Sequence, residues 1–269
     1  MSKPLDELNE LLETRFYKFY LQAVRIMLGA AKSHYLDLPD PVWLLLLGPG
    51  SSGKTEMLNL LTGLDQAETF DILNEKAFLK WIKGGFLEMF PSEREGNVDT
   101  IRGNTLFVYD NVEDPFPKPA ILHLLQQLHA GELRQTVDTK EKIWKGKVTI
   151  IGASRPVPLP EILREEFLQV KIQTSTDPGR GVKAMEQIDQ AQEIRAELRS
   201  VVKKLFDASS SAPMPTLNAE QEQRILDSFP DTAPQLAALA KSIAALQGQD
   251  QVEEQDLQDA LRVGKDTKG

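Results

Sequence analysis

The chain has 269 residues, of which 41% are hydrophobic and 26% charged, and this composition supports one large folded domain or two smaller ones. It contains no cysteine, which excludes disulfides and thiolate metal sites, and its net charge of -9 argues against a wholly basic nucleic-acid coat protein. The amino terminus is acidic where a signal peptide is basic and then apolar, and no apolar run approaches the roughly 20 residues of a membrane span. We therefore expect a soluble, cytoplasmic protein without a membrane partner.

The first expected element is a long amphipathic helix within residues 1–36. Apolar residues recur every three or four positions from Leu5 to Ala30, which is the spacing of one helix face. Gly29 should loosen this helix. Pro39 and Pro41 should end it, because proline disfavours the helical conformation in the residue before it.

A parallel sheet is expected next, because several apolar runs have the composition of strands buried on both faces. Three such runs cover residues 42–47, 105–109 and 148–153, and weaker ones cover residues 167–172 and the surroundings of Phe70. Helical stretches separate the runs, notably residues 119–129. Alternating strands and helices predict an α/β domain with a five-stranded parallel sheet over residues 37–178.

The remaining residues, 179–269, are expected to form an all-α lid domain. A charged helix is predicted over residues 182–206, followed by a linker of small residues. Asn218 with Gln221 three residues later predicts a helix that begins with a capping box. The stretches APQLAALAKSIAAL and VEEQDLQDALRV predict two further helices.

The sequence GPGSSGKT, directly after the first apolar strand, matches the phosphate-loop pattern G-x-x-x-x-G-K-[ST]. Glycines let backbone N–H groups surround a phosphate, and the helix that follows adds free N–H groups and a positive dipole end. Lys54 should reach the β- and γ-phosphates of ATP, and the Thr55 hydroxyl should bind Mg²⁺. A glycine loop with a chance lysine is the alternative. The residues expected to hold the nucleotide are Gly48, Pro49, Gly50, Ser51, Ser52, Gly53, Lys54, Thr55 and Glu56.

An aspartate follows the expected strand TLFVY. P-loop enzymes need an acidic residue at the end of a second buried strand to hold Mg²⁺, and Asp110 is in that position. An ordinary aspartate in a turn is the alternative. Many P-loop ATPases have a glutamate at the next position, where it orients and deprotonates the attacking water. Here that residue is Asn111, which can orient water but cannot accept its proton, and Glu113 and Asp114 are nearby substitutes.

These features together make residues 38–267 resemble the AAA+ ATPases. The resemblance implies that Ser154, in TIIGASRP, contacts the γ-phosphate, although a serine that opens a turn has the same appearance. It also implies an arginine finger in the segment ILREEFL, where Arg164 is available but Glu166 occupies the nearest position. The second sensor arginine of the family is missing from residues 231–233, and Lys241 follows about two turns later.

Residues 128–153 resemble uncharacterised AAA+ proteins of phages and mobile elements. Residues 236–261 resemble the lid of the helicase- and chelatase-like branch of the AAA+ family. Residues 134–147 alternate as a hairpin and carry five basic and two acidic residues, a net charge of +3. Helicase-like AAA+ rings often contact nucleic acid through such a hairpin. A solvated hairpin with its tryptophan in the core is the alternative. The residues implicated in DNA binding are Arg134, Lys140, Lys142, Trp144 and Lys145.

The favoured function is an ATP- and Mg²⁺-dependent AAA+ ATPase that acts as a homo- or hetero-oligomer on DNA or on a DNA-processing protein. One alternative is a degenerate subunit that binds ATP as a structural switch with little hydrolysis, as Asn111, Glu166 and the missing sensor arginine suggest. A P-loop kinase is a third possibility, but we find neither an arginine-rich lid nor an acceptor site in the sequence.

Overall fold

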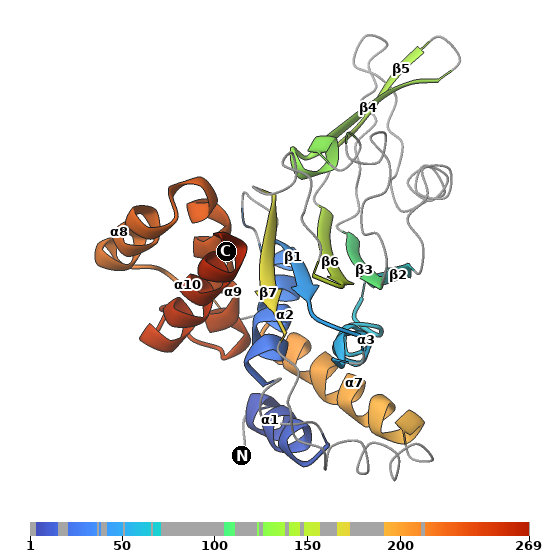
Figure 1. Cartoon of the computed structure of the whole chain (residues 1–269), viewed down its shortest axis with the longest axis vertical. Coiled ribbons are helices and arrows are strands. Elements are labelled where there is room, and N and C mark those ends of the chain that lie inside the picture. The colour runs from blue at the N-terminus through green and yellow to red at the C-terminus, as the bar shows by residue number, and fades with distance from the viewer. Residues whose placement is uncertain are drawn as a thin grey trace.

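The computed structural model describes residues 4–15, 21–36, 38, 42–50, 52–65, 67–70, 105–110, 123, 126–137, 140–145, 148–156, 166–172, 191–210 and 213–268. Figure 1 shows a central sheet with helices packed around it and a two-stranded ribbon that extends from one end of the strands. Within the described residues, no helix has both the length and the apolar character that a membrane crossing requires.

The sheet is parallel, and its strands pair in the order β2-β3-β6-β1-β7. The strands are β1 (Trp43–Leu47), β2 (Ala67–Phe70), β3 (Thr105–Asp110), β6 (Val148–Ser154) and β7 (Phe167–Lys171). β1 and β6 are buried along their whole length, which explains their nearly continuous apolar sequences. The expected mixed α/β class with parallel strands is confirmed.

The described helices are α1 (Pro4–Arg15), α2 (Leu21–His34), α3 (Lys54–Asn59), α7 (Ala191–Ala208), α8 (Ala219–Ser228), the short 3₁₀ helix η6 (Pro230–Thr232), α9 (Ala233–Leu246) and α10 (Glu254–Lys268). The predicted capping box of α8 is confirmed. The backbone N–H of Gln221 donates to Asn218 Oδ1 at 2.9 Å, and the Asn218 N–H donates to Gln221 Oε1 at 3.0 Å. These two bonds satisfy donors that a helix start otherwise leaves unpaired.

The amino-terminal segment forms α1 and α2, and residues 16–20 between them lie outside the described part. Contrary to our expectation, Gly29 does not loosen the helix, because α2 continues beyond it to His34. A Cβ atom at Gly29 would lie 2.5 Å from Ile243 Cγ1 on α9. Glycine is therefore needed here for the close approach of two helices, and the long apolar face of α2 is buried against α9 and the sheet.

The carboxyl-terminal helices lie beside the sheet, with α9 against α2 and α10 along the edge strand β7 (Figure 1). Two side chains of α10 accept bonds from this edge: the N–H of Gln169 donates to Thr267 Oγ1 at 2.9 Å, and the N–H of Lys171 donates to Asp266 Oδ2 at 3.1 Å. One cluster of buried apolar residues extends from α1 to α10. The expected domain boundary at residues 178 and 179 falls outside the described residues and stays a prediction.

Candidate nucleotide-binding site

The candidate phosphate loop, residues 48–53, leaves the carboxyl end of β1 and leads into α3. The N–H of Gly48 donates to the carbonyl oxygen of Ser154 at 3.1 Å, which ties the loop to β6. A Cβ atom at Gly48 would lie 2.8 Å from Ser52 Oγ and 2.9 Å from the Ile172 carbonyl oxygen, so a larger residue does not fit. Gly53 has a φ of 78°, in the left-handed region that favours glycine. Both glycines of the pattern are thus required by the backbone.

The Lys54 side chain folds back into this loop and is only 7% exposed. Its Nζ donates to the carbonyl oxygens of Gly48 at 2.7 Å and Pro49 at 2.8 Å, and to Ser52 Oγ at 2.9 Å. The ammonium group therefore lies where the loop curves around it. An anion that entered the loop would find a positive charge already held in place, and charge-assisted bonds to such a group are strong.

The carboxyl ends of β3, β6 and β1 lie side by side at the loop. Asp110 at the end of β3 pairs with Ala153, and Ser154 at the end of β6 pairs with Leu47. Asp110 is therefore about two strand spacings, or roughly 10 Å, from the end of β1. Open α/β sheets bind their ligands outside these carboxyl ends. The structure brings the predicted Asp110 and Ser154 to the same edge as the loop.

Ser154 is fully buried, and within the described part of the chain its Oγ has no hydrogen-bond partner. A buried hydroxyl without a partner costs free energy, so such groups need an explanation, for example a polar ligand. Its neighbour Arg155 is exposed. The contact of Ser154 with a phosphate stays a prediction, and so does the alternative of a serine that opens a turn.

An arginine that the sequence analysis missed lies close to the site. Arg195 of α7 donates to both carboxylate oxygens of Glu56, through Nε at 2.8 Å and Nη2 at 2.5 Å. These hydrogen bonds raise the pKa of Arg195 above its usual value. Glu56 directly follows Thr55, which is exposed in the first turn of α3. The signal in the sequence was the spacing of four between the basic residues 195, 199 and 203, which places them on one helix face.

Several other predicted positions are only partly described. Glu166 is half-buried directly before β7, and Lys241 is half-buried on α9, the helix that packs on α2. Residues 231 and 232 belong to η6, and Ala233 begins α9. The predicted residues that lie outside the described part are Ser51, Asn111, Glu113, Asp114 and Arg164.

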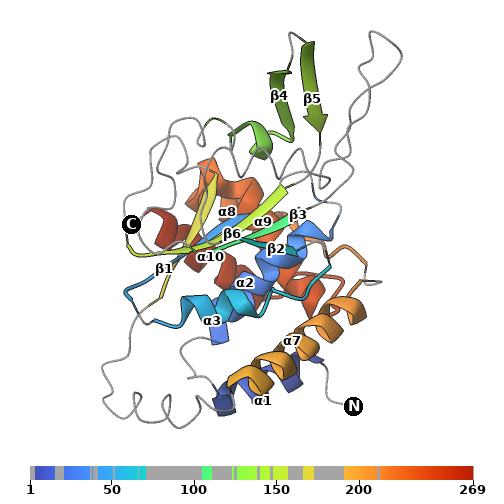
Figure 2. The ribbon, with the colours of Figure 1, turned by 90° about the vertical axis from the view of Figure 1, so that its right-hand side faces the viewer.

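The expected hairpin is confirmed. It consists of β4 (Glu132–Val137) and β5 (Lys140–Lys145), which pair antiparallel from Glu132 opposite Lys145 to Val137 opposite Lys140. Lys142 and Trp144 lie on β5 with Lys140 and Lys145, and Arg134 of β4 is exposed. Figures 1 and 2 show the ribbon extending beyond the sheet. Because β6 begins next to it, the hairpin lies at the opposite end of the strands from the phosphate loop.

Comparison with known proteins adds no relative to this picture. No protein-family model matches the chain, and no curated protein sequence matches it. The function is therefore inferred from the chemistry and geometry of the site.

Proposed function

We propose that the chain binds ATP with Mg²⁺ as a P-loop ATPase of the AAA+ type. The observation that carries this proposal is the Lys54 ammonium group, held inside a loop whose glycines at positions 48 and 53 are required by the backbone. The parallel strands support it, because they bring Asp110 and the buried Ser154 hydroxyl to the same edge. A chance lysine beside a glycine turn does not account for all three features.

The proposed roles follow from the chemistry of each group. The loop N–H groups and Lys54 hold the β- and γ-phosphates, and Thr55 and Asp110 provide oxygen ligands of the kind that Mg²⁺ prefers. The metal ion would neutralise phosphate charge. The Ser154 hydroxyl donates a hydrogen bond to a phosphate oxygen. In this proposal Asn111 orients water without accepting its proton, so we expect slow turnover unless another carboxylate or a partner subunit contributes a base.

The first test is the substitution Lys54→Ala, studied by calorimetric titration with ATP in the presence of Mg²⁺. We expect the affinity to fall by about tenfold to a hundredfold, the range expected for loss of a hydrogen bond to a charged group worth about 1.5–3 kcal/mol. Lys265→Ala removes an exposed lysine of α10 and should leave the affinity unchanged. Equal ATP affinities of the wild type and Lys54→Ala would contradict the proposal.

The turnover of ATP by the wild type separates an ATPase from a nucleotide switch. An ATPase releases phosphate continuously, and its rate should rise with protein concentration if subunits complete each other's sites. A degenerate subunit binds ATP equally well and releases little phosphate. Asn111, in the position where many P-loop ATPases carry glutamate, is the feature that favours the switch.

We also propose that the β4–β5 hairpin contacts DNA. Its segment, residues 134–147, has a net charge of +3 in a protein of net charge -9, and the ribbon extends away from the sheet. Lysines together with an aromatic residue suit a single-stranded phosphate backbone and its bases. Contact with an acidic protein partner is the other interpretation of the same charge.

The hairpin proposal is tested by replacing Lys140, Lys142 and Lys145 with glutamate. For every lysine that binds a phosphate in the wild type, its replacement should reduce the slope of log affinity against log salt by about one, and ATP affinity should not change. Reversing Arg262 and Lys265, two exposed basic residues of α10, is the control and should have a smaller effect. If the wild type binds no DNA at about 50 mM salt, where phosphate contacts are strong, a protein partner replaces DNA in the proposal.

A further inference from the structure

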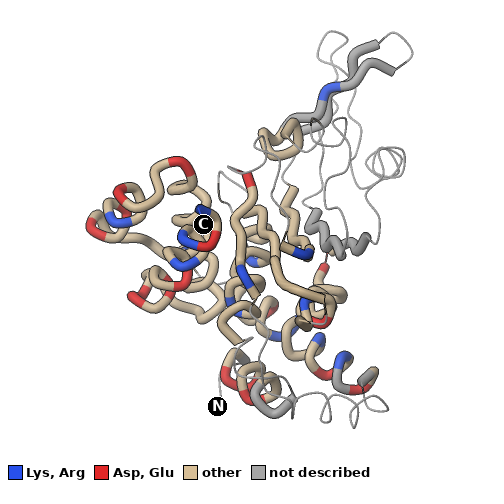
Figure 3. Tube along the Cα trace, viewed as in Figure 1, with Lys and Arg blue, Asp and Glu red and all other residues tan. Residues whose placement is uncertain are grey.

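The helix α7 presents a row of basic residues to the segment that follows the phosphate loop. Arg195, Arg199 and Lys203 are four residues apart, so they lie on one side of the helix. The apolar side of α7 is buried in the core through Leu198, Val201, Val202 and Leu205. The helix is thus anchored independently of its basic row, and the row can hold another element in position. Figure 3 shows where Lys and Arg occur along the described part of the chain.

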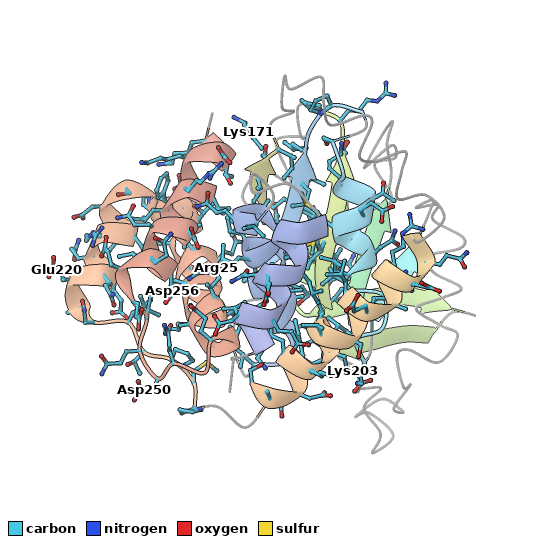
Figure 4. All side chains as sticks on the ribbon, turned by 90° about the horizontal axis from the view of Figure 1, so that it is seen from below. Arg25, Lys171, Lys203, Glu220, Asp250 and Asp256 are labelled. Atoms are coloured by element: carbon cyan, nitrogen blue, oxygen red, sulfur yellow. The ribbon has the colours of Figure 1, made fainter. Side chains whose placement is uncertain are left out.

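Each residue of the row binds a different point of the phosphate-loop helix or of the turn after it. Arg195 binds both oxygens of Glu56, and Arg199 Nε donates to the carbonyl oxygen of Asn59 at 3.0 Å. Lys203 Nζ, labelled in Figure 4, donates to the two carboxylate oxygens of Asp65 at 3.1 and 3.2 Å. The contacts therefore follow α3 from its first turn to its end and beyond.

The helix α3 needs such support, because it has only six residues, Lys54–Asn59. Isolated helices of this length are unstable in water, so neighbouring elements decide where α3 lies. Its apolar contacts to the core come from Met57 and Leu58. The Arg199 bond satisfies one carbonyl at its carboxyl end and places a positive charge at the negative end of its dipole.

The Arg195–Glu56 pair is the contact closest to the candidate site, because Glu56 directly follows Lys54 and Thr55. Two parallel N–H···O bonds fix the orientation of both partners, which a single point charge does not. We propose that Arg195 is a positioning residue, which holds the first turn of α3 through Glu56 so that Lys54 and Thr55 face the phosphates and Mg²⁺. This inference rests on the proposed function, and it assigns Arg195 no contact with the nucleotide.

The test compares Arg195→Ala with the wild type, using the whole chain, a fluorescent ATP analogue and a titration with MgCl₂. Displacement of Thr55 should raise the Mg²⁺ concentration at which the ATP analogue binds half-maximally by about fivefold. This factor corresponds to about 1 kcal/mol, the upper value for the contribution of an exposed ion pair. The exchanged pair, Glu56→Arg with Arg195→Glu, should restore a large part of the Mg²⁺ response. A role confined to overall stability would change the melting temperature without changing this response.

Arg224→Ala is the matched control, because Arg224 also makes a two-bond contact with a glutamate, Glu254, through Nη1 and Nη2 at 2.9 Å for both bonds, between α8 and α10. It should leave the Mg²⁺ response unchanged. If Arg195→Ala does not fold, Arg195→Lys keeps the charge, loses the planar fork and should give a smaller shift in the same direction. Failure of the wild type to bind the analogue would overturn the proposed function itself. Binding by the wild type with an unchanged Mg²⁺ response in the folded Arg195 variant would overturn only the role of Arg195.

Discussion

At the scale of single residues, Lys32 is an exception to the rule that charged side chains stay at the surface. It is buried in α2, with its Nζ 5.7 Å from the centre of the Phe206 ring. Burial lowers the pKa of Lys32 from 10.5 to about 8, because the charged form loses its hydration. A lysine whose pKa is lower in the folded state than in the unfolded state costs stability at neutral pH. This cost disappears when the pH exceeds the pKa of the lysine in the unfolded state.

We therefore predict that Lys32→Met stabilises the protein at pH 7. The gain should be about 1–3 kcal/mol, since a pKa difference of one unit corresponds to about 1.4 kcal/mol and the attraction of the ammonium group to Phe206 is lost. The gain should become smaller as the pH rises from about 8 to about 11, because above the unfolded pKa of 10.5 Lys32 has lost its proton in both states. Urea unfolding at both pH values measures it. Lys265→Met, at an exposed position, should show no such trend, and a gain that does not depend on pH would contradict the assignment to charge.

At the scale of elements, a polar cluster joins the amino-terminal helix α2 to α10. Arg25 Nη2 donates to Asp256 Oδ1 at 2.5 Å, and its Nε lies 3.3 Å from Asp259 Oδ2. Figure 4 shows Arg25 and Asp256 between the two helices. The Asp256 side chain is fully buried, and it also accepts bonds from Gln247 Nε2 at 2.5 Å and the Glu253 N–H at 3.0 Å. Burial raises the pKa of Asp256 despite these bonds.

Arg25→Met should destabilise the protein by about 3–5 kcal/mol at pH 7, because two buried carboxylates lose their cation. An acid whose pKa is raised by folding contributes stability below its unfolded pKa and loses this contribution as the pH rises. The loss caused by Arg25→Met should therefore be smaller at about pH 5 than at pH 7, because the raised pKa of Asp256 favours its uptake of a proton as the pH falls. Chemical unfolding at both pH values measures the effect. An equal loss of unfolding free energy at both pH values would show that the effect of Arg25→Met comes from packing and not from charge.

Helices, strands and turns were predictable from the sequence where residues close together in the chain determine them. The apolar strand before Gly48, the cap at Asn218 and the alternation around Thr136 all gave the observed elements, because each depends on residues close together in the chain. Contacts between distant segments were not predictable. Gly29 was interpreted as a helix breaker, and its partner Ile243 is far away in the sequence. Arg195 was missed for the same reason, since nothing near Glu56 indicates which helix packs beside it.

At the scale of the whole molecule, β6 connects the two proposed functional regions. It begins at Val148, next to the hairpin, and ends at Ser154, beside the phosphate loop. Trp43 at the start of β1 donates its Nε1–H to the Val148 carbonyl oxygen at 2.7 Å and packs edge-on against His129, just before the hairpin. The hairpin base is therefore attached to the same two buried strands that carry the phosphate loop and Ser154.

The contact between α10 and β7 has a consequence for how copies of this chain can assemble. An exposed edge strand offers its N–H groups to any extended chain, and this is how sheets join between molecules and how aggregates begin. On the β7 side, Asp266 and Thr267 already accept the N–H groups of Lys171 and Gln169. The sheet cannot grow across this boundary while α10 stays in place. A second chain that approached this side would meet helix surfaces and not unpaired strand N–H groups, so the docked helix protects the chain against uncontrolled strand exchange.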